Sequence, residues 1–167
     1  CWRNAINSAL NIIWISNKDE IIVSWYTCSV VVNAVIKSWW KIVYSDIEND
    51  TLGLDIDDLK NKITKNTKVI IIQHTFWKQA NNYDEIIKLA KKKKILVIED
   101  CAHSLWNNIE IKWDFAVFST GRDKVISSVT WWYLLINNKN YFSNADKIIT
   151  KLSTPNPLLV YRNLNYN

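Results

Sequence analysis

The sequence predicts an α/β fold, a three-layer α/β/α sandwich built around a mostly parallel sheet. Short runs of β-branched apolar residues alternate along the chain with segments whose apolar residues recur at helical spacing. The strand-like runs over residues 68–74 and 95–100 are nearly continuous in apolar side chains, as parallel strands buried on both faces are. Strands and helices that alternate in this way call for a sheet covered by helices on both faces.

Each element has its own signal in the sequence. Residues 3–13 are expected to form an amphipathic helix, because apolar side chains stand at positions 5, 6, 9, 10, 12 and 13. The other helices are expected over residues 29–38, 56–63, 83–93 and 143–152, and Asp55 is placed to cap the helix over 56–63. Strands are expected over residues 20–24, 41–47, 68–74, 95–100, 115–120 and 133–137.

Composition excludes several classes of protein. A hydrophobic content of 49% and a charged content of 22% are typical of a soluble globular domain, and no apolar run is long enough to cross a bilayer. The net charge of +5 comes largely from lysines on helix faces, so we expect neither a nucleic-acid partner nor a membrane partner. Three cysteines without metal-ligand spacing, and only two histidines, predict a reduced, cytoplasmic protein without a metal site.

We expect a single domain over residues 1–152. The only prolines, Pro155 and Pro157, mark its exit, and residues 153–167 are expected to lead towards a C-terminal small domain that the sequence does not contain. The chain has no Met and begins directly in a helical pattern, so we interpret it as an internal fragment of a longer protein.

The balance of tryptophan and glycine is abnormal. There are ten Trp and two Gly, whereas glycine ordinarily supplies about 7% of a chain. Trp14 follows a helix, Trp39 and Trp40 separate a helix from a strand, and Trp131 and Trp132 lead into a strand. Junctions of this kind require positive φ or close backbone approach, which glycine supplies.

We therefore expect most or all of the tryptophans to stand for encoded glycines. This would arise if the source organism reads the UGA codon as glycine and the gene was translated with a table that reads UGA as tryptophan. Glycine at all ten positions would restore the usual content of about 7%. The structure should then show tryptophans exposed at loops and helix ends, some of them with positive φ. The alternative, a protein that is simply rich in Trp, explains neither the missing glycines nor these positions.

Residues 95–104 hold the candidate site. An apolar strand ends in two carboxylates, Glu99 and Asp100, and is followed by Cys101 and His103. Ligands of open α/β sheets bind beyond the carboxyl ends of strands, so an acid and a histidine at such an edge are candidates for chemistry. From these residues alone, Asp100 could equally cap a helix and His103 could be a loop histidine.

Four segments, in order and correctly spaced, resemble the DegT/DnrJ/StrS family of PLP-dependent sugar aminotransferases when glycine replaces Trp. Residues 20–47 are similar to the family's strand, Thr loop, Asn-Ala helix and Val-Asp-Ile strand. Residues 67–86 are similar to its TKAI…H-x-(Y/F)-G segment. ILVIEDCAHSLW, residues 95–106, resembles its VIEDAAHAxG signature, and residues 114–132 resemble its GD…FSF…K…GG segment.

The resemblance implies three catalytic residues. Lys124 matches the lysine that binds PLP covalently, Asp100 the acid that pairs with the pyridine nitrogen, and His103 the residue beside the phenolic oxygen. A carboxylate that keeps the ring nitrogen protonated makes the cofactor an electron sink. The lysine amine can then move a proton at the substrate carbon.

The resemblance also implies cofactor-binding positions. Ser119 matches the serine that binds the phosphate, although a plain strand-end hydroxyl is an equal alternative. Cys28 occupies the position of the family's stacking aromatic, with Tyr26 nearby, and Arg122 stands in a run that departs from the family pattern. The phosphate loop at the first helix N-terminus matches Trp2, Arg3 and Asn4.

The function that the resemblance implies is amino transfer from an amino acid, with glutamate as the expected donor, to a keto group of a nucleotide-linked sugar in polysaccharide biosynthesis. The fold would be the incomplete large domain of a fold-type I PLP enzyme, typically a homodimer, and this fragment alone is expected to be inactive. Two alternatives stay open: a PLP enzyme of the same fold that acts on an amino acid, and a catalytically silent or regulatory relative that binds a sugar or a partner. Lys124 argues against the silent relative.

Overall fold

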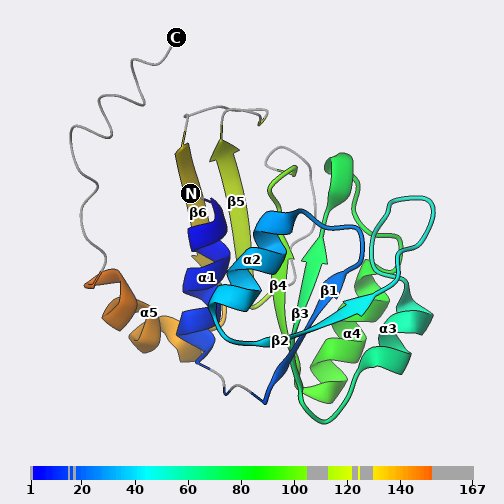
Figure 1. Cartoon of the computed structure of the whole chain (residues 1–167), viewed down its shortest axis with the longest axis horizontal. Helices are drawn as coiled ribbons and strands as arrows, with labels where there is room; N and C mark the ends of the chain where they lie inside the picture. Colours follow the sequence, from blue (N-terminus) through cyan, green and yellow to red (C-terminus); the bar gives the residue numbers. More distant parts are fainter. Residues whose placement is uncertain are drawn as a thin grey trace.

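A six-stranded sheet in the order β2-β1-β3-β4-β5-β6 forms the centre of the computed structural model, which describes residues 2–14, 16, 18–104, 113–121, 124 and 130–151 (Figure 1). Strands β1 to β5 are parallel, and β6 runs antiparallel to β5. The predicted mostly parallel α/β fold is confirmed. The strands are β1 Glu20–Ser24, β2 Lys41–Ser45, β3 Thr67–Gln73, β4 Leu96–Asp100, β5 Phe115–Gly121 and β6 Thr130–Ile136.

Helices cover both faces of the sheet and complete the three expected layers. Helices α1, α2 and α5 pack on one face, and α3 and α4 pack on the other (Figure 1). None of the helices in the described ranges is both long and apolar enough to cross a membrane. The helices are α1 Trp2–Ile13, α2 Ser29–Lys37, α3 Ile56–Lys62, α4 Tyr83–Lys93 and α5 Phe142–Ile149, with short 3-10 turns η1 Thr75–Trp77 and η2 Lys139–Tyr141.

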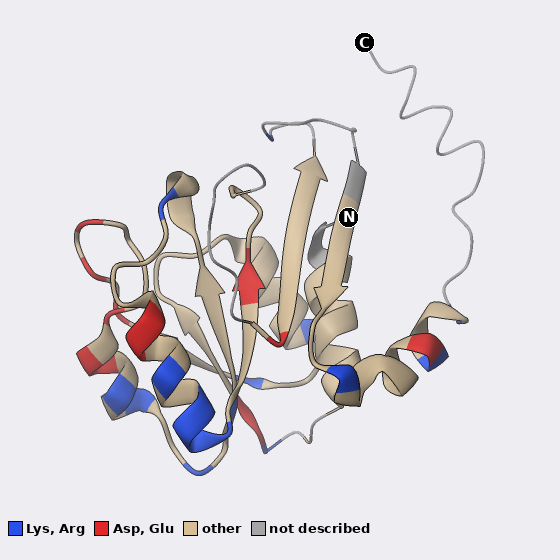
Figure 2. Ribbon diagram, turned by 180° about the vertical axis from the view of Figure 1, so that it is seen from behind, with Lys and Arg blue, Asp and Glu red and all other residues tan. Residues whose placement is uncertain are grey.

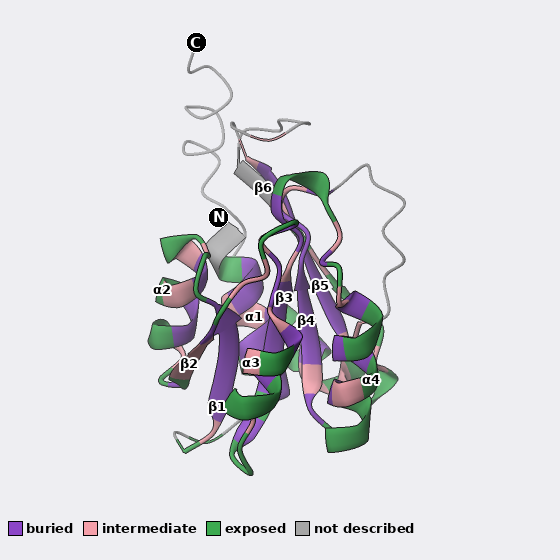
Figure 3. Cartoon of the chain, turned by 90° about the vertical axis from the view of Figure 1, so that its right-hand side faces the viewer, coloured by how far each residue is buried: buried purple, intermediate pink, exposed green. Residues whose placement is uncertain are grey.

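Apolar strand residues hold the layers together. Successive side chains of a strand point to opposite faces of the sheet, so Ile21 and Val23 join the core beneath α1 and α2, whereas Ile22 joins the core beneath α3 and α4. Figure 3 shows the strands buried in the middle of the molecule and exposed residues on the outer sides of the helices. Burying each Val or Ile side chain contributes about 1.5–3 kcal/mol, so these two cores stabilise the fold.

The ends of α3 and α4 carry capping and charged side chains that stabilise them. The Asp55 side chain accepts hydrogen bonds from the N–H groups of Asp57 and Asp58, which confirms it as the N-cap of α3. Helix α4 begins with acids and ends in three lysines, as its dipole favours, and Figure 2 shows charged residues gathered on these outer helices. Lys94, with φ of 56°, ends α4 in the left-handed conformation.

Three tryptophans adopt the backbone conformation that favours glycine. Trp14, Trp39 and Trp77 have φ of 42°, 63° and 64°. Trp14 donates its N–H to the Leu10 carbonyl at the end of α1 and is 85% exposed, and Trp39 follows α2 and is 84% exposed. The expectation of tryptophans exposed at helix ends, some with positive φ, is confirmed at these positions.

Other tryptophans depart from that expectation. Trp40 is only 8% exposed and belongs to the core beneath α1 and α2. Trp131 and Trp132 do not precede a strand, as we expected, but lie inside β6, where they pair with Thr120 and Ser119 of β5. Pairing along the whole of β5 extends β6 at its start, because ladder hydrogen bonds outweigh local sequence preference.

Most element boundaries agree with the predicted ones to within two residues. The last helix differs more, since α5 ends at Ile149 rather than at residue 152. Residues 153–167, expected as the exit from the domain, and Trp106 lie outside the described residues.

Neighbouring tryptophans offer a matched test of the backbone assignment. Trp39→Gly should raise the free energy of unfolding by about 1 kcal/mol, because it relieves a left-handed conformation that a side chain disfavours. Trp40→Gly should lower it by about 3 kcal/mol or more, because it empties a buried indole site. Urea denaturation of the two variants measures both effects, and a loss of stability in Trp39→Gly would contradict the assignment.

Candidate active site

The carboxyl ends of parallel strands meet at one edge of the sheet, and a pocket lies there. Its residues come from the loop after β1, from the ends of β3 and β4, and from the segment after β5. Cys28, Asp100, His103 and Lys124, which the sequence singled out, lie together in this pocket. The pocket has a volume of about 180 Å³ and is lined by Cys28, Gln73, His74, Asp100, Ala102, His103 and Lys124.

Asp100 is the buried acid of the pocket. It ends β4 between Gln73 of β3 and Val117 of β5, and its carboxylate accepts a hydrogen bond of 3.1 Å from the Ala102 N–H. Burial raises the pKa of Asp100 to about 7, against the opposing effects of the Ala102 N–H and of the positive charges of His74 and Lys124. Residues 101–104 form a turn and not a helix, so the alternative of a helix cap does not apply within the described residues.

His103 is held by an aromatic neighbour. Its imidazole stacks on Phe76, with ring centroids 6.0 Å apart and planes inclined by 16°. Phe76 lies in η1 with φ of 49°, and Trp77 follows with φ of 64°. The strained loop after β3 thus places an aromatic face against a histidine of the pocket.

Hydrogen bonds tie together the wall of the pocket next to Cys28. Cys28 precedes α2 and lines the pocket, whereas Tyr26 is exposed and is not among the lining residues described. The Thr27 hydroxyl donates to the Gln73 side chain at 2.7 Å, and the Gln73 amide donates to the Thr75 hydroxyl at 2.9 Å. These bonds connect the loop after β1 to the end of β3, and so fix the position of residue 28.

Ser119 and Asn4, two of the positions expected to bind phosphate, are not among the described residues that line the pocket. Ser119 is buried on β5, and its hydroxyl accepts a hydrogen bond from the Gly121 N–H at 3.3 Å. Trp2, Arg3 and Asn4 form the first turn of α1, which starts at the end of the sheet where β5 ends (Figure 1). Free N–H groups of a helix start suit an anion. Arg122 lies outside the described residues.

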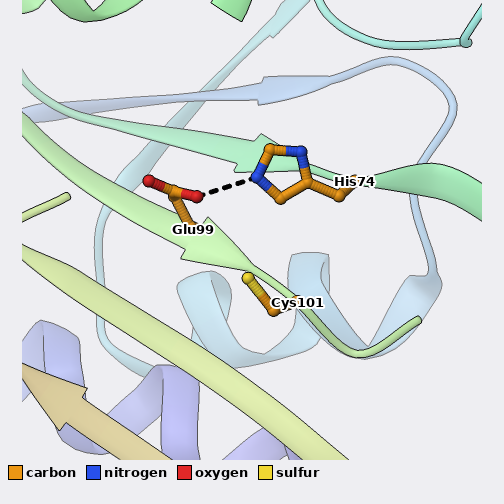
Figure 4. A group of neighbouring side chains, drawn as sticks. All are labelled: His74, Glu99 and Cys101. Atoms are coloured by element: carbon orange, nitrogen blue, oxygen red, sulfur yellow. Dashed lines mark hydrogen bonds and ion pairs between the residues drawn. The ribbon is translucent and has the colours of Figure 1, made fainter. Parts of the chain in front are cut away.

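A buried polar cluster, which we did not predict, lies behind Asp100. His74 Nε2 lies 2.8 Å from a Glu99 oxygen, and both side chains are fully buried (Figure 4). The Tyr83 hydroxyl of α4 donates to the other Glu99 oxygen. The sequence held one signal, an acid inside the apolar run over residues 95–100, because buried acids need partners.

Cys101 adjoins this cluster, and the three residue types suit a metal. Ligand atoms of His74, Glu99 and Cys101 lie within 4.8 Å of one another (Figure 4). Burial, followed by the charges of Glu99 and Asp100, raises the pKa of the Cys101 thiol. Both Glu99 oxygens already accept hydrogen bonds. We therefore interpret His74, Glu99 and Tyr83 as a hydrogen-bonded cluster, with Cys101 beside it.

Known proteins resemble this chain in sequence. The sequence profile of the DegT/DnrJ/EryC1/StrS aminotransferase family matches residues 3–112. The chain is 29% identical over 146 residues to GDP-perosamine synthase of Escherichia coli O157:H7. This aligned stretch covers 84% of this chain and 40% of that protein. It thus spans less than half the length of the curated relatives it matches.

Solved structures share the fold. An aminotransferase from Psychrobacter cryohalolentis superposes with a TM-score of 0.80 at 21% identity, over 93% of this chain and 43% of that one. NtdA from Bacillus subtilis, solved with bound cofactor PMP, superposes with a TM-score of 0.79 at 25% identity, over 89% of this chain and 34% of that one.

The buried carboxyl of Asp100 predicts a pH dependence of stability. The unfolded chain loses the Asp100 proton near pH 4, whereas the folded protein keeps it up to a pKa of about 7. Between these values the folded state binds more protons, so its free energy of unfolding should fall as the pH rises. Asp100→Asn should lack this contribution. From pH 4.5 to pH 8 its free energy of unfolding should therefore rise relative to that of the wild type. Urea denaturation at both pH values tests this, and parallel pH profiles would contradict it.

Proposed function

The chain belongs to the DegT/DnrJ/EryC1/StrS aminotransferase family, and we propose that the whole protein is a PLP-dependent aminotransferase. The reaction we propose moves an amino group from an amino acid, with glutamate as the donor, to a keto group of a nucleotide-linked sugar. The observation that carries this proposal is the pocket that brings Asp100, His103 and Lys124 together at the carboxyl edge of the sheet.

The residues of the pocket fit PLP. A buried carboxylate suits a protonated ring nitrogen, because each charge offsets the desolvation of the other, and Asp100 is such a group. Lys124 supplies a primary amine in the same pocket. When bound, PLP supplies an electron sink that stabilises negative charge on the substrate carbon. Asp100 and Lys124 would hold it, with His103 beside its ring and the N–H groups at the start of α1 near its phosphate.

Each side chain then has a defined task. Asp100 keeps a proton on the ring nitrogen, and the pKa of about 7 that burial gives it falls when a cation lies beside it. Lys124 carries a proton to and from the substrate carbon through its Nζ. His103 is fixed by its stack on Phe76, so it can hold an oxygen of the cofactor in one orientation.

The substrate class rests on relatives. GDP-perosamine synthase and a UDP-4-amino-4,6-dideoxy-N-acetyl-beta-L-altrosamine transaminase, both similar in sequence, carry nucleotide sugars in their names. We extend this to a nucleotide-sugar substrate for the whole protein. From the family resemblance we also propose that residues 1–152 are part of its PLP-binding large domain and that the whole protein is a cytoplasmic homodimer. A catalytically silent relative is disfavoured, because Lys124 lies in the pocket.

Covalent trapping tests the assignment of Lys124. In the full-length protein, borohydride should fix PLP to the peptide that contains Lys124, as seen by peptide mass. Lys124→Ala should abolish the fixed adduct and lower transamination by at least about a thousandfold, the size of effect expected when a group acts in the chemical step.

The control is Lys60→Ala, which removes a lysine of α3 whose ion pairs within the described part of the chain are with the surface acids Asp57 and Glu85. It should leave both the adduct and the activity unchanged. An adduct that persists in Lys124→Ala would sink the assignment.

A further inference from the structure

We propose that His74 is a positioning residue for Asp100, held in place by the buried carboxylate of Glu99 and supported from α4 by Tyr83. The proposal rests on the function proposed above, since it concerns how the acid of that site is kept ionised and in place.

The contacts fix the imidazole of His74 from two sides. Nε2 meets the Glu99 carboxylate at 2.8 Å, and the ring packs edge-on against Tyr83, with centroids 5.5 Å apart and planes inclined by 63°. Nδ1 is buried without a hydrogen-bond partner among the described residues, so the Glu99 contact sets the ring's orientation. Both side chains are fully buried, so neither can exchange the other for water without opening the core.

The main chain of His74 fixes the end of β4. Its N–H donates to the Asp100 carbonyl at 3.2 Å, and the Ser104 hydroxyl donates to the His74 carbonyl at 3.3 Å. Residue 74 therefore touches both ends of the turn that carries Asp100 and His103. A shift of the His74 imidazole would therefore move both Asp100 and His103.

Glu99 and Asp100 divide the two faces of β4 between them. Adjacent strand residues point to opposite faces, and Glu99 faces the α4 layer, where Tyr83 donates to it. Asp100 lines the pocket together with His74. Glu99 thus has its partners behind the strand, whereas His74 lies close enough to the strand end to lower the pKa of Asp100.

The balance of charges around Asp100 explains why this matters. Burial favours its neutral form, whereas pairing with a cationic ring needs the carboxylate. Among the described groups, His74 at the end of β3 and Lys124 after β5 lower the pKa of Asp100, and His103 lines the pocket from the following turn. On its own strand and turn, Glu99 and Cys101 are the titratable neighbours, and Cys28 faces the pocket from the loop after β1.

The test is binding of pyridoxamine phosphate to the full-length protein at several pH values from 6 to 9. This probe needs no covalent bond to Lys124, so its affinity reports on the pocket alone. His74→Gln should weaken binding about tenfold at pH 7 and little at pH 9, since one pH unit in the ionisation of Asp100 corresponds to a factor of about ten. Glu99→Gln should do the same, and the double variant should add little to either single variant.

Glu20→Gln is the matched control, because Glu20 is another buried acid with a lysine and a threonine partner, at the opposite end of the sheet. It should leave the affinity unchanged at every pH. Tyr83→Phe is the milder variant if His74→Gln fails to fold, and its affinity profile should move in the same direction by a smaller amount.

The outcomes separate the two proposals. A loss of affinity that is equal at all pH values in His74→Gln, or in Tyr83→Phe, would mean that the cluster acts only through folding and would overturn this inference. Wild-type protein that does not bind pyridoxamine phosphate at any pH would instead overturn the proposed function.

A second inference rests on independent observations. We infer that positions 14, 39 and 77, written as tryptophan, are glycine in the natural protein. Among the described residues, six that are not glycine have positive φ, and three of these are tryptophans, although the chain has only ten Trp in 167 residues. All three are exposed by more than half, so their indoles gain little from burial while the backbone favours glycine.

The coding DNA and the natural protein decide this point. We expect UGA codons at positions 14, 39 and 77. We also expect peptides from the source cells to carry the mass of glycine at these positions. UGG codons, or peptides with the mass of tryptophan, would overturn it.

Discussion

Burial of the parallel sheet on both faces is the constraint on which the rest of the structure depends. Parallel strands leave no face for water, so α1 and α2 must cover one side and α3 and α4 the other. Each connection between two parallel strands crosses one face of the sheet, so that all parallel strands run in the same direction and end at the same edge. The carboxyl ends of β1, β3, β4 and β5 therefore meet, and residues as far apart in sequence as Cys28 and Lys124 line one pocket.

That same burial makes polar groups at the edge costly unless they are paired. Glu99 lies inside an apolar strand, and its two carboxylate oxygens are hydrogen-bonded, one to Tyr83 and the other to His74, which offsets the cost of burial. Asp100, one residue on, has a single backbone donor from Ala102 in the described structure. Burial raises the pKa of Asp100, and the Ala102 N–H opposes this only in part. A site that tunes a cofactor needs such an under-paired acid, because a fully paired one would not respond to a ligand.

The tryptophans show how local conformation and packing can disagree. At residues 14 and 39 the backbone turns left-handed at a helix end and leaves the indole in solvent, as expected where glycine belongs. At residue 40, one position on, the side chain is in the core. Helix-end geometry is a local property, whereas the space around residue 40 is made by helices and strands from other parts of the chain.

The sequence by itself determined the fold class, the order of strands and helices, the Asp55 cap and four of the residues that line the pocket. It could do so because periodicity, capping and the residues at strand ends are local signals. Only the tertiary structure decided the start of β6, the burial of Trp40 and the cluster of His74, Glu99 and Tyr83. Those depend on strand register and helix placement: His74 and Glu99 lie 25 residues apart in sequence, and they meet because β3 and β4 pair in one register.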